Sequence, residues 1–351
     1  MSLEQQVMAL RTAVTLAAGD HIACVRVRGA DAVEALDRVS PRALFARPGK
    51  MSHTLLLDDD ARPIADVYLC CDEDDCFVLA EGMSAAAVTE YLTEYLIEHV
   101  QARAGGLDVE LDDLSHSHAM VTLNGPYAWE LLGELTTPDV IGLPYLGFFH
   151  ADAFTCFRGG KTGEYGYDLL VERDRLAGLR DHILTLGRRF ELAEISLAAL
   201  ETAQLENLFW NPRRDSAPGL TPIELQLQWR VSYDREFPGS AALHRRRRAV
   251  HRRAVLLCAD RELAADARVV ADGRDIGGVL HAGASPTRGD WLAIAIVERA
   301  LAHAGLDFTV GGVPARALSA PAIDNRSLLV DPQRHAFATR DTDPFPPLVR
   351  R

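Results

Sequence analysis

Residues 24–39 read CVRVRGADAVEALDRV and decide how the first part of the chain folds. The stretch up to Arg28 predicts a short strand, Gly29 opens a turn, and Pro41 stops the helix that follows. That helix has one apolar face, made by Ala32, Val33, Leu36 and Val39. The same pattern returns 96 positions later around Gly125. Two related strand–turn–helix units are therefore expected, and at both glycines we favour tight backbone packing over anion binding at the helix start.

The segments around these two units mix strands and helices without regular alternation. Short apolar runs at 53–57, 64–70 and 77–80 are separated by acidic turns and predict an antiparallel meander. An amphipathic helix is expected at 84–103. Further strands are expected at 153–157 and 167–171, and helices at 174–186 and 196–207. This order favours the α+β class over a doubly wound parallel sheet.

The last third of the chain differs in composition from the rest. A loop rich in proline at 211–222 precedes a basic run at 244–253, which is either a solvated helix end or a cradle for an anionic tail. Five short stretches rich in valine, isoleucine and alanine follow, at 254–258, 267–270, 276–280, 291–297 and 308–310. Their spacing predicts a small β-barrel or sandwich.

Composition excludes several classes of function. The chain has 351 residues with 37 Lys+Arg and 50 Asp+Glu, a formal net charge of −13, which disfavours nucleic-acid binding over a broad basic face. No apolar run is long enough to span a membrane and the first residues lack the apolar core of a signal peptide, so we expect a soluble, cytoplasmic protein. The six cysteines form no C-x-x-C pair, and His116 and His118 lack a third ligand at metal spacing, so no metal site is expected.

Two places in the sequence combine charge with apolar surroundings. Asp66 lies inside the apolar strand predicted at 64–70, where it either faces solvent or meets a partner in a cleft. The cluster KTGEYGYD at 161–168 carries Glu164 and Asp168 around a tight turn. It is either an ordinary acidic hairpin or a site for a ligand rich in N–H donors, such as an aminopyrimidine ring. Nucleotide, nicotinamide, serine-hydrolase and zincin motifs are not found.

Seven short motifs in order give the chain a resemblance to a known family. They are the Arg28-Gly29 turn, the strand 64–66, LNGP at 123–126, the cluster at 161–168, TPIELQLQW at 221–229, FPGSAAL at 237–243 and GASPT at 283–287. Together they resemble the aminomethyltransferase family, which includes the T-protein of the glycine cleavage system and folate-dependent demethylases. The resemblance implies a three-domain cloverleaf that holds tetrahydrofolate. We expect a discontinuous folate-binding domain at 1–23 and 110–215, a second α+β domain at 24–109, a connecting segment at 216–253 and a C-terminal β-barrel domain at 254–351.

The resemblance also implies roles for single residues. Asp66 matches the second acid of an Asp-Asp pair that faces the reactive edge of the folate, and is the expected catalytic residue. The expected folate-binding residues are Asp168, Glu164, Glu81, Lys161 and Trp229. Several positions depart from the family pattern: Ala65 replaces the first acid, Glu81 an asparagine, Lys161 a tyrosine and Leu200 an arginine. A lead segment found in the T-protein is also missing before Arg11, so a wider channel or one closed by a partner chain is expected.

These departures decide the function that we expect from the sequence. It is transfer of a methyl or methylene unit between tetrahydrofolate and a small molecule, in an enzyme that is not the housekeeping T-protein. Asp66 would orient or accept a proton and stabilise developing positive charge. A lipoyl carrier protein is not expected as a partner, and homo-oligomer formation stays open. The alternatives are a folate-binding scaffold or regulatory protein without activity, and a hydrolase or cyclase that reuses the folate site.

Overall fold

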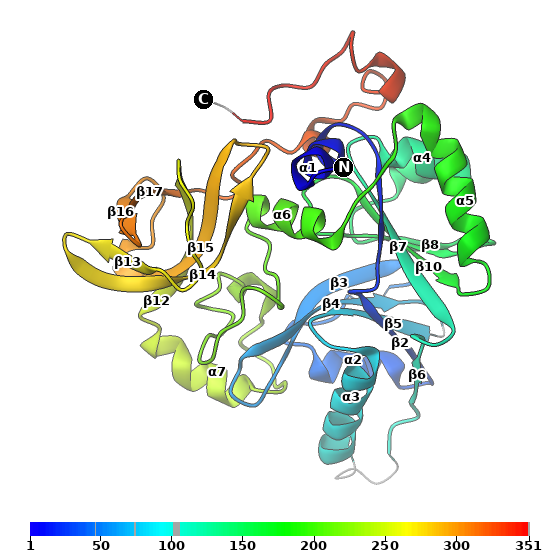
Figure 1. Ribbon diagram of the computed structural model, residues 1–351. Coiled ribbons are helices and arrows are strands. Elements are labelled where there is room, and N and C mark those ends of the chain that lie inside the picture. Colours follow the sequence, from blue (N-terminus) through cyan, green and yellow to red (C-terminus); the bar gives the residue numbers. More distant parts are fainter. Residues whose placement is uncertain (46, 74, 101–105, 350–351) are drawn as a thin grey trace.

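The computed structural model describes residues 1–45, 47–73, 75–100 and 106–349 and arranges them as three lobes (Figure 1). Each lobe is built on one β-sheet: a six-stranded sheet, a five-stranded sheet and a closed barrel. The α+β class and the C-terminal barrel expected from the sequence are confirmed. No helix in the described part of the chain is long and apolar enough to cross a bilayer.

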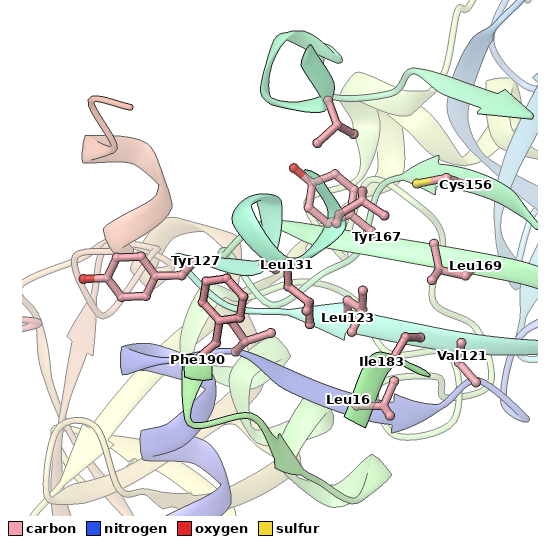
Figure 2. Packing of buried hydrophobic residues seen from close by; sticks show 14 of the residues in the cluster. Leu16, Val121, Leu123, Tyr127, Leu131, Cys156, Tyr167, Leu169, Ile183 and Phe190 are labelled. Atoms are coloured by element: carbon pink, nitrogen blue, oxygen red, sulfur yellow. The ribbon is translucent and has the colours of Figure 1, made fainter. Parts of the chain in front are cut away.

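The first lobe contains the six-stranded sheet in the order β11-β1-β7-β10-β9-β8. Its strands are β1 (Thr15–Ala18), β7 (His118–Asn124), β8 (Phe148–His150), β9 (Thr155–Arg158), β10 (Gly166–Glu172) and β11 (Ala193–Glu194). Its helices are α1 (Leu3–Thr12), α4 (Ala128–Leu135), α5 (Leu176–Gly187) and α6 (Leu197–Asn207). Leu123 of β7, Leu169 of β10 and Ile183 of α5 meet in the core between this sheet and its helices (Figure 2).

The second lobe contains the five-stranded sheet in the order β3-β4-β5-β2-β6. Its strands are β2 (Ala23–Arg28), β3 (Lys50–Leu57), β4 (Pro63–Cys71), β5 (Asp75–Glu81) and β6 (Glu110–Asp113). Strands β3, β4 and β5 pair antiparallel, which confirms the predicted meander. Helices α2 (Ala32–Val39) and α3 (Ala85–Val100) pack on one face; the predicted last turn of α3, at 101–103, lies outside the described residues.

The two sheets repeat one topology, as the sequence pattern predicted. The order β8-β9-β10-β7-β1 of the first sheet matches β3-β4-β5-β2-β6 of the second. Gly29 and Gly125 hold φ of +115° and +129°, which favours glycine. A Cβ at Gly29 would lie 2.1 Å from the carbonyl oxygen of Asp108, and one at Gly125 would lie 2.2 Å from that of Ala13. Close backbone packing therefore explains both glycines.

The face of each sheet that is free of these helices is turned toward the other sheet. Along β4, Val67 and Leu69 point to the helices of their own lobe, whereas Tyr68 and Cys70 join a core shared with Met120 of β7 and other residues of the first sheet. The same alternation along β10 sends Leu169 to its helices and Leu170 to the shared core. Polar residues that follow this alternation are thus buried between the sheets.

The third lobe is a closed barrel with strand order β12-β15-β14-β13-β16-β17. Its strands are β12 (Arg252–Ala259), β13 (Arg268–Ala271), β14 (Arg274–Ser285), β15 (Asp290–Glu298), β16 (Asp307–Val310) and β17 (Val313–Leu318). The basic run belongs largely to α7 (Ser240–Arg246) and the 3-10 turn η4 (Arg247–Ala249). Leu227 and Leu243 of the connecting region pack with Leu55 of β3 and Leu256 of β12, which joins the second and third lobes.

Two segments extend differently from the boundaries expected from the sequence. Strand β6 pairs with β2, so the second sheet continues to Asp113 rather than ending at residue 109. The barrel ends with β17 at Leu318, and the chain then returns to the first lobe, where Phe337 and Phe345 pack on Tyr127. Both departures come from contacts between segments that are distant in sequence: strand pairing in the first case and aromatic packing in the second.

Candidate functional site

The candidate site is a polar pocket at one end of the interface between the first two sheets. Strands β4 and β5 contribute Asp66 and Glu81, and β10 contributes Asp168. The turn between β9 and β10 contributes Lys161. The remaining lining residues are His21, Ile22, Tyr68, Leu79, Thr122, Asn124, Gly160, Thr162, Leu200 and Gln204. The structure therefore brings together four of the six residues predicted for the site.

Asp66 is buried and all of its visible partners are nitrogen donors. Its Oδ1 accepts hydrogen bonds from Nη1 of Arg230 at 2.6 Å and from Nε2 of His53 at 2.7 Å. Its Oδ2 accepts from Nζ of Lys161 at 3.1 Å. Arg230 lies in the 3-10 turn η3 (Gln228–Arg230), so the connecting region between the second and third lobes supplies one of the two cations.

Glu81 brings a second carboxylate next to Asp66, because the two residues are directly opposite across β4 and β5. Like charges in that position repel each other unless a cation lies between them. Nζ of Lys161 is 2.9 Å from Oε1 of Glu81 and thus bridges both acids. Oε2 of Glu81 also pairs with Arg213 at 3.2 Å, and Arg213 pairs with Glu201 of α6. The result is a continuous ion network from η3 to α6.

The network fixes the charge state of its members. Burial alone would raise the pKa of Asp66, but Arg230 and Lys161 outweigh it and hold that pKa well below its usual range. Burial lowers the pKa of His53 to about 4, so this imidazole is neutral at pH 7 and donates through Nε2. Burial also works against the charge of Lys161, yet Asp66 and Glu81 raise its pKa. Asp66 is therefore a permanent anion and a poor proton acceptor near neutral pH.

Asp168 is in the opposite electrostatic situation. Lys161, the cation of the pocket, pairs with Asp66 and Glu81 instead of Asp168. Burial raises the pKa of Asp168 to about 7, and a hydrogen bond from the Thr122 hydroxyl opposes this only in part. Thr122 is the cross-strand neighbour of Asp168 and accepts in turn from the amide of Asn124 at 2.8 Å. This carboxyl is held in place without a counter-charge.

Helix α6 closes the pocket with a neutral surface. Leu200 and Gln204 are four residues apart and so lie on the same side of the helix. Both are buried, and Oε1 of Gln204 has no hydrogen-bond donor among the described residues. A buried acceptor without a donor is costly. Gln204 and Asp168 thus offer this pocket two acceptors that a ligand with N–H groups can satisfy.

Glu164 and Trp229, also predicted for the site, do not line the pocket. Glu164 accepts hydrogen bonds from the backbone and hydroxyl of Ser327, at 2.8 and 2.7 Å, and lies 3.4 Å from Arg11. Arg11 in turn pairs with Glu206 at 2.7 Å and donates to Asn325 at 3.2 Å. We call Arg11, Glu164, Glu206, Asn325 and Ser327 the clasp, because these side chains tie α1 and α6 to the returning C-terminal segment. Trp229 is 54 % exposed and lies beneath the guanidinium of Arg230.

Sequence reasoning missed His53, Arg230 and Gln204. A strand-pairing argument could have found His53, since His53 is directly opposite Tyr68 and Tyr68 shares a strand face with Asp66. Arg230 and Gln204 have no such signal. They lie 164 and 138 positions from Asp66 in the chain, on elements whose placement depends on tertiary packing.

Comparisons with known proteins agree on one family. The family described as GCVT N-terminal domain matches residues 1–235. The aminomethyltransferase of Streptomyces coelicolor is 29% identical over 320 residues, which are 87% of this chain and 84% of that protein. That of Thermotoga maritima is 26% identical over 307 residues, 86% and 82% of the two chains. The structure of the glycine cleavage system aminomethyltransferase T from Bartonella henselae has the same fold, with a TM-score of 0.78 at 23% identity over 91% of this chain and 89% of that chain.

Proposed function

Because the chain belongs to the GCVT N-terminal domain family, we propose that it transfers a methyl or methylene unit between tetrahydrofolate and a small molecule. Its relatives are aminomethyltransferases, which favours an enzyme over a folate-binding scaffold. The observation that carries the proposal is the environment of Asp168. Asp168 is a buried carboxyl without a counter-charge, in a pocket that also holds the unsatisfied acceptor of Gln204.

The chemistry of these acceptors suits the ring of a reduced folate. A pterin presents adjacent N–H donors, and a carboxylate accepts two parallel hydrogen bonds from such an edge. Asp168 would hold the ring in this way, with Gln204 as a second acceptor from α6. Bound tetrahydrofolate would supply the nitrogen atoms that carry the one-carbon unit. Glu164 is not part of this holder, because the clasp occupies its carboxylate.

Asp66 would act through its fixed charge. Arg230, Lys161 and His53 orient its carboxylate and keep it ionised, so the charge is present before any ligand arrives. A preorganised anion in a buried pocket stabilises neighbouring positive charge more than water does. Orienting and stabilising are thus the proposed roles of Asp66, whereas its lowered pKa disfavours proton acceptance. Lys161 and Glu81 hold this anion in position.

Tetrahydrofolate is expected to bind with release of a proton, because the ionised form of Asp168 is the one that accepts hydrogen bonds. With a pKa of about 7, close to half of the free protein is protonated at pH 7, so about half a proton per site is released at that pH. Affinity should fall by up to about tenfold per pH unit below pH 7. Calorimetric titration in two buffers of different ionisation enthalpy measures the proton count.

The same titration decides whether tetrahydrofolate binds at all. At 100 times the dissociation constant, binding should add about 2.7 kcal/mol of stability and raise the melting temperature. Proton release in the wild type but none in Asp168→Asn would support the assignment of Asp168. No thermal shift with millimolar tetrahydrofolate would refute the folate site.

We further propose that the one-carbon partner is a small free molecule rather than an aminomethylated lipoyl carrier. The apolar side chain of Leu200 is buried in the wall of the pocket, and the Lys161–Glu81 pair fills space beside Asp66. Incubation with aminomethylated carrier protein and tetrahydrofolate is therefore expected to release no ammonia above the background without enzyme. A glycine-cleavage T-protein is the positive control. Ammonia release at the rate of that control would contradict this part of the proposal.

A further inference from the structure

A second cavity lies beside the pocket and is lined by residues of both of the first two lobes. Its volume is about 480 Å³, against about 30 Å³ of free space in the pocket itself. We call it the outer groove; its polar lining includes Asp20, His21, Asp113, His116, His118 and Arg173. The pocket is too narrow for a ring-sized ligand as it stands, so part of its wall must move when a ligand enters.

Two side chains of the pocket wall are less buried than the others. Of the described side chains that line the pocket, all are buried except those of His21 and Ile22. These two residues also line the outer groove, and they are the described residues that the two cavities share. The ring of His21 forms no hydrogen bond with any described residue, so rotating it breaks none. Burial lowers the pKa of His21, so the imidazole is neutral at pH 7.

The charge of the outer groove selects what can approach this wall. Asp20 and Asp113 are carboxylates, and Arg173 is the opposing cation among the described lining residues. Nε and Nη2 of Arg173 both donate to the carbonyl oxygen of Ser115, at 3.1 and 2.8 Å. The Asp and Arg side chains together give the groove a formal charge of −1. Such a lining attracts cations and repels carboxylates.

We propose that the outer groove is the entry route of a small aliphatic amine, positively charged in water, and that the side chains of His21 and Ile22 are the movable wall between the groove and the pocket. The amine would then arrive beside the permanent anion of Asp66. Use of the amine as one-carbon partner rests on the proposed function, whereas the route itself does not.

The route can be tested with thiol reagents, because five of the six native cysteines are buried and the sixth is partly buried. His21→Cys is treated with the cationic reagent 2-aminoethyl methanethiosulfonate and the anionic reagent 2-sulfonatoethyl methanethiosulfonate, and rates are divided by those on glutathione. We expect the cation to react faster by on the order of fivefold at low salt, and the ratio to fall with added salt. At 100 times its dissociation constant, tetrahydrofolate should slow labelling by up to about 100-fold, since only about 1% of the protein is then free.

Two further variants make the result specific. His118→Cys is the matched control: it lies in the outer groove but not in the pocket, so its labelling should be insensitive to tetrahydrofolate. Ile22→Cys reports on the same wall if His21→Cys does not fold. Equal rates for both reagents, faster labelling by the anion, or labelling of both wall variants that tetrahydrofolate leaves unchanged despite binding would overturn the proposal. If tetrahydrofolate does not bind the wild type, the proposed function fails, while the rate ratio still decides the route.

Discussion

Asp66→Asn is expected to lower the free energy of unfolding by about 3–5 kcal/mol, the usual cost of removing one partner from a buried ion pair. The carboxylate of Asp66 neutralises Arg230 and Lys161, which are both buried. An amide keeps the shape but leaves the two cations with one negative charge fewer. Urea unfolding monitored by circular dichroism at pH 7 gives the difference.

The pH dependence of the same variant adds a second check. The folded-state pKa of Asp66 lies well below the ordinary 3.8, so the stability that its charge contributes is present above about pH 4 and is lost as the pH falls further. The gap between wild type and variant should therefore narrow in acid. Asp307→Asn is the control, because Asp307 forms an exposed pair with Arg316 that is worth about 0–1 kcal/mol. Equal losses of unfolding free energy in the two variants would show that the buried cations Arg230 and Lys161 do not depend on the charge of Asp66.

Asp168→Asn is expected to stabilise the protein without ligand while it weakens the binding of tetrahydrofolate. Burial raises the pKa of Asp168 from 3.8 to about 7. This carboxyl therefore lowers the free energy of unfolding by a growing amount as the pH rises from about 4 to 7, by its full amount above pH 7, and not at all below about pH 4. The shift of about 3 pKa units corresponds to at most about 4 kcal/mol at pH 8. The variant should thus melt higher than the wild type at pH 8, and the difference should decline steadily toward pH 4.

Binding should change in the opposite direction from stability. Loss of a charged hydrogen-bond acceptor costs on the order of 1.5–3 kcal/mol of binding free energy, and a residue that holds the ring in ground and transition states alike affects affinity more than the chemical step. Thr122→Val is a graded control, since it removes the hydrogen bond to Asp168 but keeps the carboxyl. A less stable Asp168→Asn at pH 8, or one with unchanged affinity, would show that this carboxyl is not a strained ligand holder.

Local pattern was sufficient for most of the strands and helices. The alternation that predicted the meander also placed Asp66 inside β4, and the repeated glycine pattern correctly indicated two related units. Helix α1 and strands β1, β6, β8, β11 and β17 were not predicted. Strand β6, for example, has four residues, and one of them, Leu111, is apolar. Local pattern also did not distinguish the roles of neighbouring acids. Glu164 and Asp168 were both predicted to bind folate, yet of these two residues only Asp168 lines the pocket.

The charge balance of the site could not be obtained from local pattern. Asp66 alone looked like a candidate base, and the structure makes it a permanent anion because Arg230 arrives from a turn 164 residues later. Asp168 looked like one of two equivalent acids, and its raised pKa follows from burial without a paired cation. Sequence pattern predicts which strand carries an acid, but the pKa depends on what the tertiary fold places beside it.

The clasp has a consequence for how the protein is made. Arg11 and Asn325 are hydrogen-bonded partners separated by 314 positions. Glu164 likewise accepts a hydrogen bond from Ser327, which lies 163 positions later in the chain. The last helix of the first lobe, α6, ends at Asn207, which is 118 positions before Asn325. At a synthesis rate on the order of 5–20 residues per second, the first lobe is therefore complete about 6–24 seconds before Asn325 is added. During that interval Arg11 and Glu206 can neutralise each other, but Glu164 lacks its main donors. The contacts that hold the first lobe are therefore complete only after Ser327 has been added, and a chain stalled before residue 325 should remain open to proteolysis at the segment around Glu164.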